Sequence, residues 1–573
     1  MVIKITNTEE MRAIEAAADE AGISYQTMME RAGQAAAERA LQLIEHLSDP
    51  RVTVLIGPGN NGGDGLVTGL LIKQANEAAD VRFYLLTERP EDDPYIPVIH
   101  EVGLFTALAS DDGDKRVLRN MVASSDLVID ALFGIGIRLP LRDEAAKVLR
   151  AVRRGLLDRE KEHKEAETWS INPAQAPSEA GSGVKILAID GPSGLDFDTG
   201  QIDTTALTAD ETVTFIAAKY GQLLFPGAQS VGQLTVANLG IPDKVKELKS
   251  IEATLLDAAT VADLLPARNQ DSNKGTFGKA MIVAGSVNYV GAANLAARSA
   301  YRSGVGLVSV ASARPVAGML AAATPEATWV LLPHDMGVVS DGATDMFFEE
   351  IGKYSALLIG PGMGQEDTTQ RFLFQVLDHN RKQAVPKRRG LGFANLPPAN
   401  DTEDDKAEAS ELPPLVIDAD GLNMLSKEDE WWKHLPENTI LTPHPGEMAR
   451  LTGLSIEEVQ KDRFGIVSEK AKEWNTIILL KGAHTLIAEP KGRVTALPFK
   501  NDALATAGTG DVLAGLIVGL LAQGMAPYDA ACAGAYLHAF AGEFAAQALG
   551  PRSVIASDVI DALSSAFKAL TPA

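Results

Sequence analysis

The first half of the chain is organised around VTVLIGPGNNGGDG, residues 52–65. An apolar run of strand type ends in a glycine-rich turn, and a helical pattern follows from Leu66. Similar strand-like runs recur at residues 81–86, 127–134, 185–190, 211–217 and 234–240. Apolar runs that alternate with helical stretches indicate βαβ units and a mostly parallel sheet, in which ligands bind at the carboxyl ends of the strands. Functional residues are therefore expected in the loops that follow the strands.

A second series of strand-like runs begins at residue 279, and the chain is mainly helical from Thr506 onward. The polar, charged segment 241–250 separates the two series. Because 573 residues are too many for one ordinary core, we predict an α/β protein of two domains, residues 1–245 and 250–573. The runs of the second series span residues 279–286, 306–312, 356–364, 415–423, 439–447 and 476–484.

Residues 8–21 and 24–46 are predicted to form helices ahead of the first strand-like run, with Thr8 and Ser24 as their N-caps. Another helical pattern, rich in Ala, contains Cys532, the single cysteine of the chain. One cysteine excludes an intrachain disulfide, and we interpret Cys532 as a buried structural thiol.

Two segments, residues 155–183 and 381–414, are rich in charge, Pro, Ser and Gly. Neither can bury much apolar surface, so we expect surface insertions without chemistry of their own. Each precedes a strong strand and therefore enlarges a helix-to-strand connection, on the rim opposite the expected ligand side. The basic cluster 387–389 and the acidic run 403–405 are interpreted as solvated loop.

The composition and net charge of the chain exclude several classes of protein. Hydrophobic residues make up 46% and charged residues 22% of the chain, which is typical of a globular protein. The net charge of -24 repels phosphate backbones, so nucleic acid is not an expected partner. The first residues lack the apolar core of a signal peptide, and the most apolar run, residues 512–521, is too short to span a bilayer. We expect a cytoplasmic enzyme that does not bind a membrane.

Three strand-end loops of the first half carry polar groups. The loop after residue 56 contains a GxGxxG pattern together with Asn60, Asn61 and Asp64. Glycines let backbone amides approach a phosphate, although the same pattern also fits a tight turn with Asn in left-handed conformations. Asp130 and Asp190 stand where two further apolar runs stop. Three acidic loops at one rim predict an oxygen-lined site.

The strongest local signal of the second half is AGTGDVLAG, residues 507–515. Glycines ahead of a helix start form an anion hole for a phosphoryl group, and Asp511 at that start can accept a proton from an attacking hydroxyl. The alternative is an ordinary Asp-capped helix. No GxxxxGK[ST] loop and no Cys/His zinc spacing is present. Further polar strand-end loops span residues 360–364, 418–423, 442–447 and 481–485.

GNNGGDG, DALFGIGIRLP and DGPSGLD together resemble the NAD(P)H-hydrate epimerase domain, also called the YjeF N-terminal domain, over about residues 1–240. The resemblance implies a Rossmann-like three-layer sandwich and a potassium ion held by Asn61, Asp130 and Ser193. Asp190 is our candidate catalytic residue, because a carboxyl group could protonate the hydroxyl that leaves the hydrated ring and activate the returning water. The resemblance also implies substrate contacts at Asn60, Asn61, Gly62, Gly63, Asp64, Gly134, Ile135, Gly136, Ile137, Arg138, Leu139, Pro140 and Asp190.

AGTGD is similar to the ribokinase-like superfamily. Together with GPGMG, DADGLN, TPHPGE and KGAHT it resembles the ADP/ATP-dependent NAD(P)H-hydrate dehydratase domain, over about residues 255–573. The resemblance implies a ribokinase-like three-layer sandwich that uses Mg²⁺, with Asp418 and Glu447 near the metal. Substrate contacts would be Ala292, Gly362, His444 and the catalytic Asp511. Nucleotide contacts would be Lys481, Gly482, Ala483, His484, Thr485, Thr506, Ala507, Gly508, Thr509, Gly510 and Gly515.

Both resemblances predict repair of the hydrated cofactors NADHX and NADPHX. The first domain would interconvert their R and S forms, and the second would dehydrate the S form with hydrolysis of ADP or ATP. A homo-oligomer is expected from the family. Two alternatives remain at this point: a ribokinase-like small-molecule alcohol kinase fused to a nucleotide-binding domain, and a protein whose first half only senses nucleotides. The Asp130 and Asp190 motifs count against the second alternative.

Overall fold

The computed structural model describes residues 2–164, 183–242, 244–384 and 412–571. The chain divides into two compact units, Ile3–Ile251 and Glu252–Ala573. Most of both predicted insertions, including 387–389 and 403–405, lies outside the described residues.

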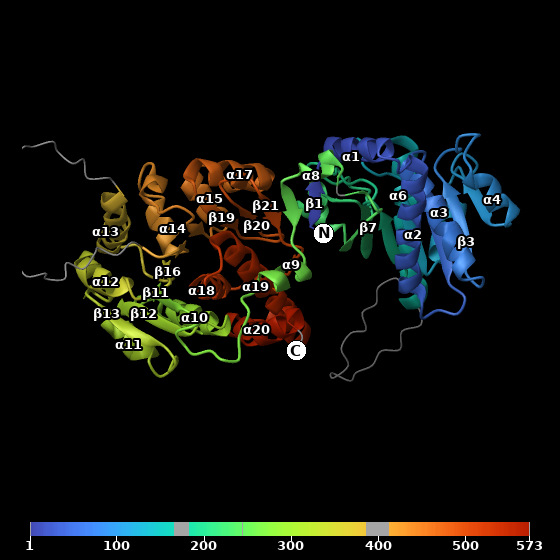
Figure 1. The fold of residues 1–573 in the computed structure, drawn as a ribbon. Coiled ribbons are helices and arrows are strands. Elements are labelled where there is room, and N and C mark those ends of the chain that lie inside the picture. The colour runs from blue at the N-terminus through green and yellow to red at the C-terminus, as the bar shows by residue number, and fades with distance from the viewer. Residues whose placement is uncertain (1, 165–182, 243, 385–411, 572–573) are drawn as a thin grey trace, which may run out of the picture. The chain divides into compact units, whose positions relative to one another are not determined.

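The first unit alternates strands and helices along most of its length (Figure 1). Its strands pair in parallel in the order β4-β3-β2-β5-β6-β7-β9, and β1 pairs with β8. The elements are β1 (Ile3–Thr6), α1 (Thr8–Glu20), α2 (Tyr25–Ile44), β2 (Arg51–Ile56), α3 (Asn60–Ala75), β3 (Asp80–Leu85), α4 (Tyr95–Glu101), β4 (Phe105–Leu108), α5 (Arg116–Ala123), β5 (Leu127–Ala131), α6 (Asp143–Lys164), β6 (Lys185–Ile189), β7 (Glu211–Phe215), β8 (Ala218–Lys219), α7 (Tyr220–Leu223), η1 (Gly227–Gln229), β9 (Gln233–Ala237) and α8 (Lys246–Lys249).

Helices cover both faces of this sheet, because successive side chains of a strand point to opposite faces. Val52 and Val54 of β2 belong to the core formed with α2 and α3. Leu55 follows Val54, points to the opposite face and belongs to the core formed with α5 and α6. A strand buried on both faces reads as a continuous apolar run, which is why VTVLI signalled a strand so clearly. The first unit is a three-layer α/β sandwich, as predicted.

The second unit is also built on a mainly parallel sheet. Its strands pair in the order β13-β12-β11-β16-β17-β18-β19-β20-β21-β10, with antiparallel pairing only on the two sides of β20. The elements are β10 (Ala253–Leu255), α9 (Ala258–Leu264), β11 (Lys279–Val283), α10 (Val290–Arg302), β12 (Leu307–Ala313), α11 (Arg314–Leu320), β13 (Thr328–Leu332), β14 (His334–Asp335), β15 (Val338–Val339), η2 (Asp341–Ala343), α12 (Thr344–Ile351), β16 (Ala356–Ile359), α13 (Asp367–Ala384), β17 (Leu415–Ile417), α14 (Asp420–Leu425), η3 (Trp431–His434), β18 (Ile440–Leu441), α15 (Pro445–Thr452), α16 (Ile456–Lys461), α17 (Arg463–Trp474), β19 (Ile477–Leu480), β20 (Leu486–Ala488), β21 (Val494–Ala496), η4 (Asp502–Leu504), α18 (Thr509–Ala522), α19 (Pro527–Leu549), η5 (Pro551–Ser553) and α20 (Ala556–Leu570).

This sheet too is buried on both faces. Ala280 and Ile282 of β11 pack into the core formed with α10, α18, α19 and α20. Met281 and Val283 point to the other face and are also fully buried. The predicted three-layer α/β arrangement is therefore confirmed here as well. Cys532 is buried inside α19, as expected for a structural thiol.

Three local predictions need correction. The first helix is capped by Asn7 and not by Thr8, because Glu10 stands three residues after Asn7 and completes a capping box. Helix α3 begins at Asn60 and not at Leu66, so the Asn-rich segment is the first turn of the helix. Helix α6 runs to Lys164, so residues 155–164 are helical and not part of an insertion. Ser24 does cap α2, as predicted.

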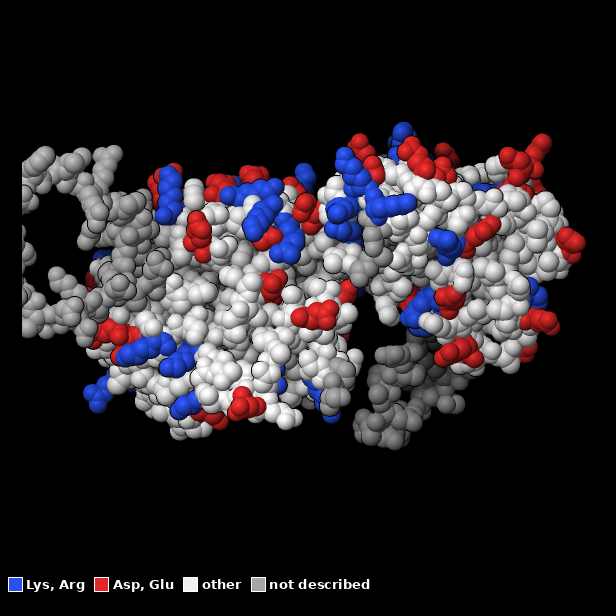
Figure 2. Space-filling view, viewed as in Figure 1, with Lys and Arg blue, Asp and Glu red and all other residues white. Residues whose placement is uncertain are grey.

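Acidic and basic side chains are interspersed on the visible face of both units in Figure 2. Among the residues that the structure describes, none of the helices combines the length and the apolar character that a membrane span requires.

Candidate active sites

The candidate site of the first unit lies at the point in the sheet where the strand order reverses. From β2 the chain crosses to β3 on one side, whereas β5 pairs with β2 on the other side. Ligands of open parallel sheets bind at such a switch point, beyond the carboxyl ends of the strands. A cavity of about 820 Å³ lies there. It is lined by Arg12, Glu15, Tyr25, Pro58, Gly59, Asn60, Asn61, Asp64, Leu132, Phe133, Gly134, Ile135, Gly136, Ile137, Asp190, Phe215 and Lys219.

Asp190 follows β6 directly and has a left-handed φ of 64°. Its Oδ1 atom accepts hydrogen bonds from Lys219 Nζ at 2.6 Å and from Thr214 Oγ1 at 2.9 Å. The carbonyl oxygen of Asp190 accepts a further bond, 2.6 Å long, from Gln222 Nε2. The Lys219 side chain is only 2% exposed, so a buried ion pair fixes the Asp190 carboxylate toward the cavity.

Two more carboxyl groups face the same cavity. Burial raises the pKa of Asp64 well above its usual value, and the charges of Asp190 and Glu15 raise it further. Burial also raises the pKa of Glu15, with Asp190 as the second cause. The cavity therefore combines a carboxylate paired with Lys219 and two carboxyl groups that resist ionisation. Such an arrangement can both donate and accept protons.

Two of the residues assigned to potassium, Asp130 and Ser193, are in direct contact. Ser193 donates to the carboxylate of Asp130 through Oγ at 2.6 Å and through its backbone N at 2.8 Å. Phe133 N donates to Ser193 Oγ. Asn61 is 8% exposed, and neither its side-chain oxygen nor its nitrogen has a hydrogen-bond partner among the described residues. An unpartnered buried amide oxygen and an all-oxygen donor set fit a hard cation.

The predicted substrate contacts of this unit do not all line the cavity. Asn60, Asn61, Asp64, Gly134–Ile137 and Asp190 line it. The others are absent from the cavity wall: Gly62, Gly63, Arg138, Leu139 and Pro140. Gly62 has a packing role instead, because a Cβ there would overlap the carbonyl oxygen of Gly57.

Several cavity residues were missed by sequence reasoning. Glu15 and Arg12 come from α1, and Tyr25 comes from the start of α2. Phe215 is the last residue of β7 and Lys219 the last residue of β8. Only Lys219 gave a local signal, since a lysine that follows the apolar run ETVTFIAA is unusual at a buried position.

The candidate site of the second unit is formed by loops after neighbouring parallel strands. Strands β16, β17, β18 and β19 pair in that order, so the loops that follow them meet at one rim. A cavity of about 200 Å³ lies beside the start of α18. It is lined by Lys481, Gly482, Ala483, Thr485, Leu497, Phe499, Asn501, Leu504, Ala505, Thr509, Gly510, Leu513, Ala535, His538 and Ala539.

A buried ion pair lies at the centre of this rim. Lys481 Nζ donates to Asp418 Oδ1 at 2.7 Å, and Thr442 Oγ1 donates to the same atom at 2.7 Å. A Cβ on Gly510 would lie 3.4 Å from Lys481 Nζ and 4.0 Å from Asp418 Oδ2. The first turn of α18 therefore runs directly past the ion pair, and Gly510 leaves this approach open.

Two carboxyl groups beside the ion pair titrate near neutrality. Burial, followed by the negative charge of Asp418, raises the pKa of Asp511 to about 7. Burial also raises the pKa of Glu447 to about 7, against the opposing charge of Lys481. Burial disfavours the charged form of Lys481 itself, but Asp418 and Glu447 outweigh that effect and raise its pKa. Asp511 thus has the pKa that suits a general base at neutral pH.

Ala292 and His444, two of the predicted substrate contacts of this unit, each lie beside a glycine. A Cβ on Gly362 would lie 2.8 Å from the Cβ atoms of Ala292 and Tyr289, so the three residues are neighbours. His444 Nδ1 accepts a hydrogen bond from Gly446 N at 2.9 Å, and the ring is half exposed. A neutral His444 therefore carries its proton on Nε2, and burial together with Lys481 lowers its pKa.

Among the predicted nucleotide contacts, Lys481, Gly482, Ala483, Thr485, Thr509 and Gly510 line the cavity. His484 does not, because it is buried and its Nδ1 lies 2.9 Å from the carbonyl oxygen of Leu497. Gly515 packs α18 against Ala296 of α10. Thr506, Ala507 and Gly508 are also absent from the cavity wall.

Other parts of the cavity wall were not predicted from the sequence. Phe499 and Asn501 follow β21, and His538 lies within α19. His538 Nε2 is buried and has no hydrogen-bond partner among the residues that the structure describes.

Comparison with known proteins identifies both halves of the chain. A family model described as YjeF-related protein N-terminus matches residues 25–221. Another, described as NAD(P)H-hydrate dehydratase, matches residues 280–385 and 390–565. A bifunctional NAD(P)H-hydrate repair enzyme from Moorella thermoacetica is 35% identical over 549 residues, which cover 94% of this chain and 91% of that protein.

A second relative and a solved structure are also similar to this chain. A bifunctional NAD(P)H-hydrate repair enzyme from Escherichia coli is 31% identical, over 96% of this chain and 90% of its own length. A solved ADP/ATP-dependent NAD(P)H-hydrate dehydratase from Bacillus subtilis, co-crystallised with ATP and Mg²⁺, is 30% identical. It covers 55% of this chain and 98% of its own, with a TM-score of 0.44. On the evidence of the two family models and the relatives of similar length, the chain belongs to the family of bifunctional NAD(P)H-hydrate repair enzymes.

Proposed function

We propose that this chain repairs the hydrated cofactors NADHX and NADPHX. Residues 1–245 interconvert the R and S forms, and residues 250–573 dehydrate the S form to NADH or NADPH with hydrolysis of ADP or ATP. The observation that carries the proposal is the position of Asp511, which lies in the first turn of α18 beside the Lys481–Asp418 ion pair and has a pKa of about 7. A base at a helix start, next to a lysine, suits transfer of a phosphoryl group to an alcohol.

The first reaction inverts C6 of the hydrated ring. Loss of the C6 hydroxyl leaves an iminium ion that the ring nitrogen stabilises, and water then returns to either face. Asp190 is the proposed acid–base residue, because Lys219 and Thr214 hold its carboxylate in one orientation at the cavity wall. The substrate contacts proposed in this unit are Asn60–Asp64, Gly134–Pro140 and Asp190.

The second reaction removes the same hydroxyl from the S form. Asp511 accepts the hydroxyl proton while the oxygen attacks the terminal phosphoryl group of the nucleotide. Phosphate then leaves C6 as a proton leaves C5, which restores the dihydronicotinamide. Lys481 and the amides that start α18 stabilise the charge on the transferring group. Ala292, Gly362 and His444 are proposed to contact the hydrated cofactor, and residues 481–483, Thr485 and residues 506–510 the nucleotide.

Two cations complete the proposal. Potassium would be held by Asn61, Asp130 and Ser193 and would fix the loops around the epimerase cavity. Mg²⁺ would neutralise nucleotide phosphates, with Asp418 and Glu447 close by. Mg²⁺ sites of this kind use one or two carboxylates together with substrate phosphates, which agrees with two carboxyl groups at this rim. The homo-oligomer and the cytoplasmic location stay predictions.

The test compares the amount of restored dihydropyridine with the amount of phosphate released. The protein is mixed with hydrated NADH, Mg²⁺ and ATP or ADP, and the absorbance of restored dihydropyridine is followed together with inorganic phosphate. Equal amounts of dihydropyridine and phosphate are expected. A stable phosphorylated product without restored absorbance would identify an alcohol kinase instead and overturn the proposal.

A further inference from the structure

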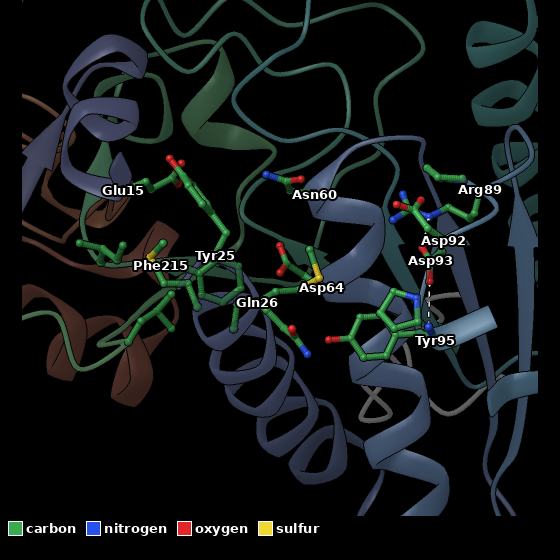
Figure 3. A pocket seen from close by; sticks show the side chains of 17 residues that line it. Glu15, Tyr25, Gln26, Asn60, Asp64, Arg89, Asp92, Asp93, Tyr95 and Phe215 are labelled. Carbon is green, nitrogen blue, oxygen red and sulfur yellow. Dashed lines mark hydrogen bonds and ion pairs between the residues drawn. The ribbon is translucent and has the colours of Figure 1, made fainter. Parts of the chain in front are cut away.

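A second cavity opens beside the one that holds Asp190. Its volume is about 390 Å³, within the range of small-molecule sites (Figure 3). It is lined by residues of α1, α2 and α3, the loop before α4, and the ends of β7 and β9. The two cavities are contiguous, because both are lined by Glu15, Tyr25, Asn60, Asp64 and Phe215.

The wall of the second cavity suits a flat aromatic ring. Tyr25, Met28, Met29, Tyr95 and Phe215 contribute rings and thioethers, which pack well against a base. In Figure 3 the Tyr95 ring projects from the start of α4 toward Asp64 and Gln26. The Tyr95 hydroxyl oxygen is buried and has no hydrogen-bond partner among the described residues. A buried hydroxyl of this kind is left for a ligand or water to bind.

The wall of this cavity carries carboxyl groups and little positive charge. Arg89 is the only Lys or Arg among its lining residues, whereas Glu15, Asp64, Asp92 and Asp93 are all present. The Arg89 guanidinium is already committed to Asp93 Oδ2 at 2.8 Å and to the carbonyl oxygens of Gly57 and Gly59 at 3.0 and 2.9 Å. The cavity therefore offers a phosphate group no cation without a protein partner.

We propose that the second cavity binds the adenosine half of the hydrated dinucleotide while the hydrated nicotinamide lies beside Asp190. The proposal rests on the proposed epimerase function. The pyrophosphate would then pass the first turn of α3, where Asn60 and Asp64 line both cavities. A helix start provides backbone amides for such an anion.

The acidic wall also determines which cofactor is preferred. NADPHX carries a 2′-phosphate on its adenosine, which would bring negative charge close to the exposed Asp92, whereas Asp93 is paired with Arg89. NADHX carries a hydroxyl at the same position and avoids this repulsion. The epimerase site is therefore selective for NADHX.

The experiment measures R/S interconversion without nucleotide, so that the dehydratase does not act. The substrates are NADHX, NADPHX and the hydrated reduced mononucleotide, which lacks the AMP half. Tyr95→Ala is expected to raise KM for NADHX about tenfold with kcat unchanged, because stacking with the base is lost. It is expected to leave KM for the mononucleotide unchanged. Val98→Ala, on the exposed side of α4, is the matched control and changes neither.

Asp92→Lys gives an independent measurement, since Asp92 is exposed and its replacement leaves the core untouched. It is expected to reverse the preference from NADHX to NADPHX. An equal KM increase for NADHX and the mononucleotide in Tyr95→Ala, or wild-type protein that favours NADPHX, would overturn the adenosine site. Wild-type protein that epimerises none of the three substrates would instead overturn the proposed epimerase function, and the adenosine site with it.

Discussion

The two sites of this chain use the same residue types, Asp and Lys at strand ends, but pair them differently. In the first unit the catalytic candidate itself, Asp190, is bound to the buried Lys219. In the second unit Lys481 is bound to Asp418, and the catalytic candidate Asp511 stands beside that pair with a pKa of about 7. The first site therefore orients its catalytic candidate by a direct ion pair, whereas the second site places its candidate beside an ion pair formed by two other residues.

The largest expected effect separates the two sites by function. Asp511→Asn removes the proton acceptor of the dehydratase and should lower its kcat about 10²–10⁴-fold. Epimerisation, measured as R/S interconversion without nucleotide, should stay at the wild-type rate. Unchanged dehydration in this variant would show that another group takes the hydroxyl proton.

The second effect tests the buried pair. Lys219→Met leaves the Asp190 carboxylate buried without its partner, and breaking such a pair costs about 3–5 kcal/mol. Urea unfolding of the first unit should show this loss, and epimerisation should fall with it.

The double variant Lys219→Met/Asp190→Asn is the matched control for that experiment. It removes both charges and should recover most of the lost stability, although not the activity. A double variant as unstable as Lys219→Met would mean that packing of the lysine stem, and not the charge pair, stabilises the site.

The third effect is the pH dependence of the dehydratase reaction. Asp511 must be ionised to accept a proton, so kcat/KM of the dehydratase should rise about tenfold per pH unit below pH 7 and level off above it. Asp511→Glu, with a lengthened side chain, keeps a titrating base and serves as the comparison. A dehydratase profile that is flat from pH 5 to pH 8 would contradict this assignment.

The last effect concerns stability. Since the pKa of Asp511 is raised in the folded protein, its contribution to stability is fully present below the unfolded pKa of about 3.9 and is lost as the pH rises through about 7. Asp511→Asn should therefore gain stability relative to wild type between pH 4 and pH 8, by no more than about 4 kcal/mol. Thermal unfolding at several pH values measures the difference. A constant difference between the two proteins would contradict the raised pKa.

The parts of both sites that the sequence could predict are those carried by local signals. Glycines ahead of a helix start marked Asp511. Glycines and aspartates that end apolar runs marked Asn60, Asp190 and Gly362, because parallel strands bring the loops that follow them to one rim. The same reasoning explains why the α/β class was predictable. Strands β4 and β13, each at an edge of its sheet, were missed, although β13 reads as the apolar run TWVLL.

The parts that could not be predicted depend on tertiary packing. Glu15 and Tyr95 reach the cavities from helices whose sequences show only an amphipathic or short helical pattern. His484 was predicted to contact nucleotide from its motif, but its ring hydrogen-bonds within the fold. Neither the partner of a side chain nor the direction in which it points can be read from its spacing to a glycine.

The central claim is that two sites act in sequence on the two stereoisomers of one substrate. A mixture of R and S NADHX with ATP and Mg²⁺, followed by dihydropyridine absorbance, tests it most directly. Wild-type protein should convert the whole mixture, and Asp190→Asn should stop once the S form is consumed, apart from slow spontaneous epimerisation. Complete conversion by Asp190→Asn at the wild-type rate would contradict the account.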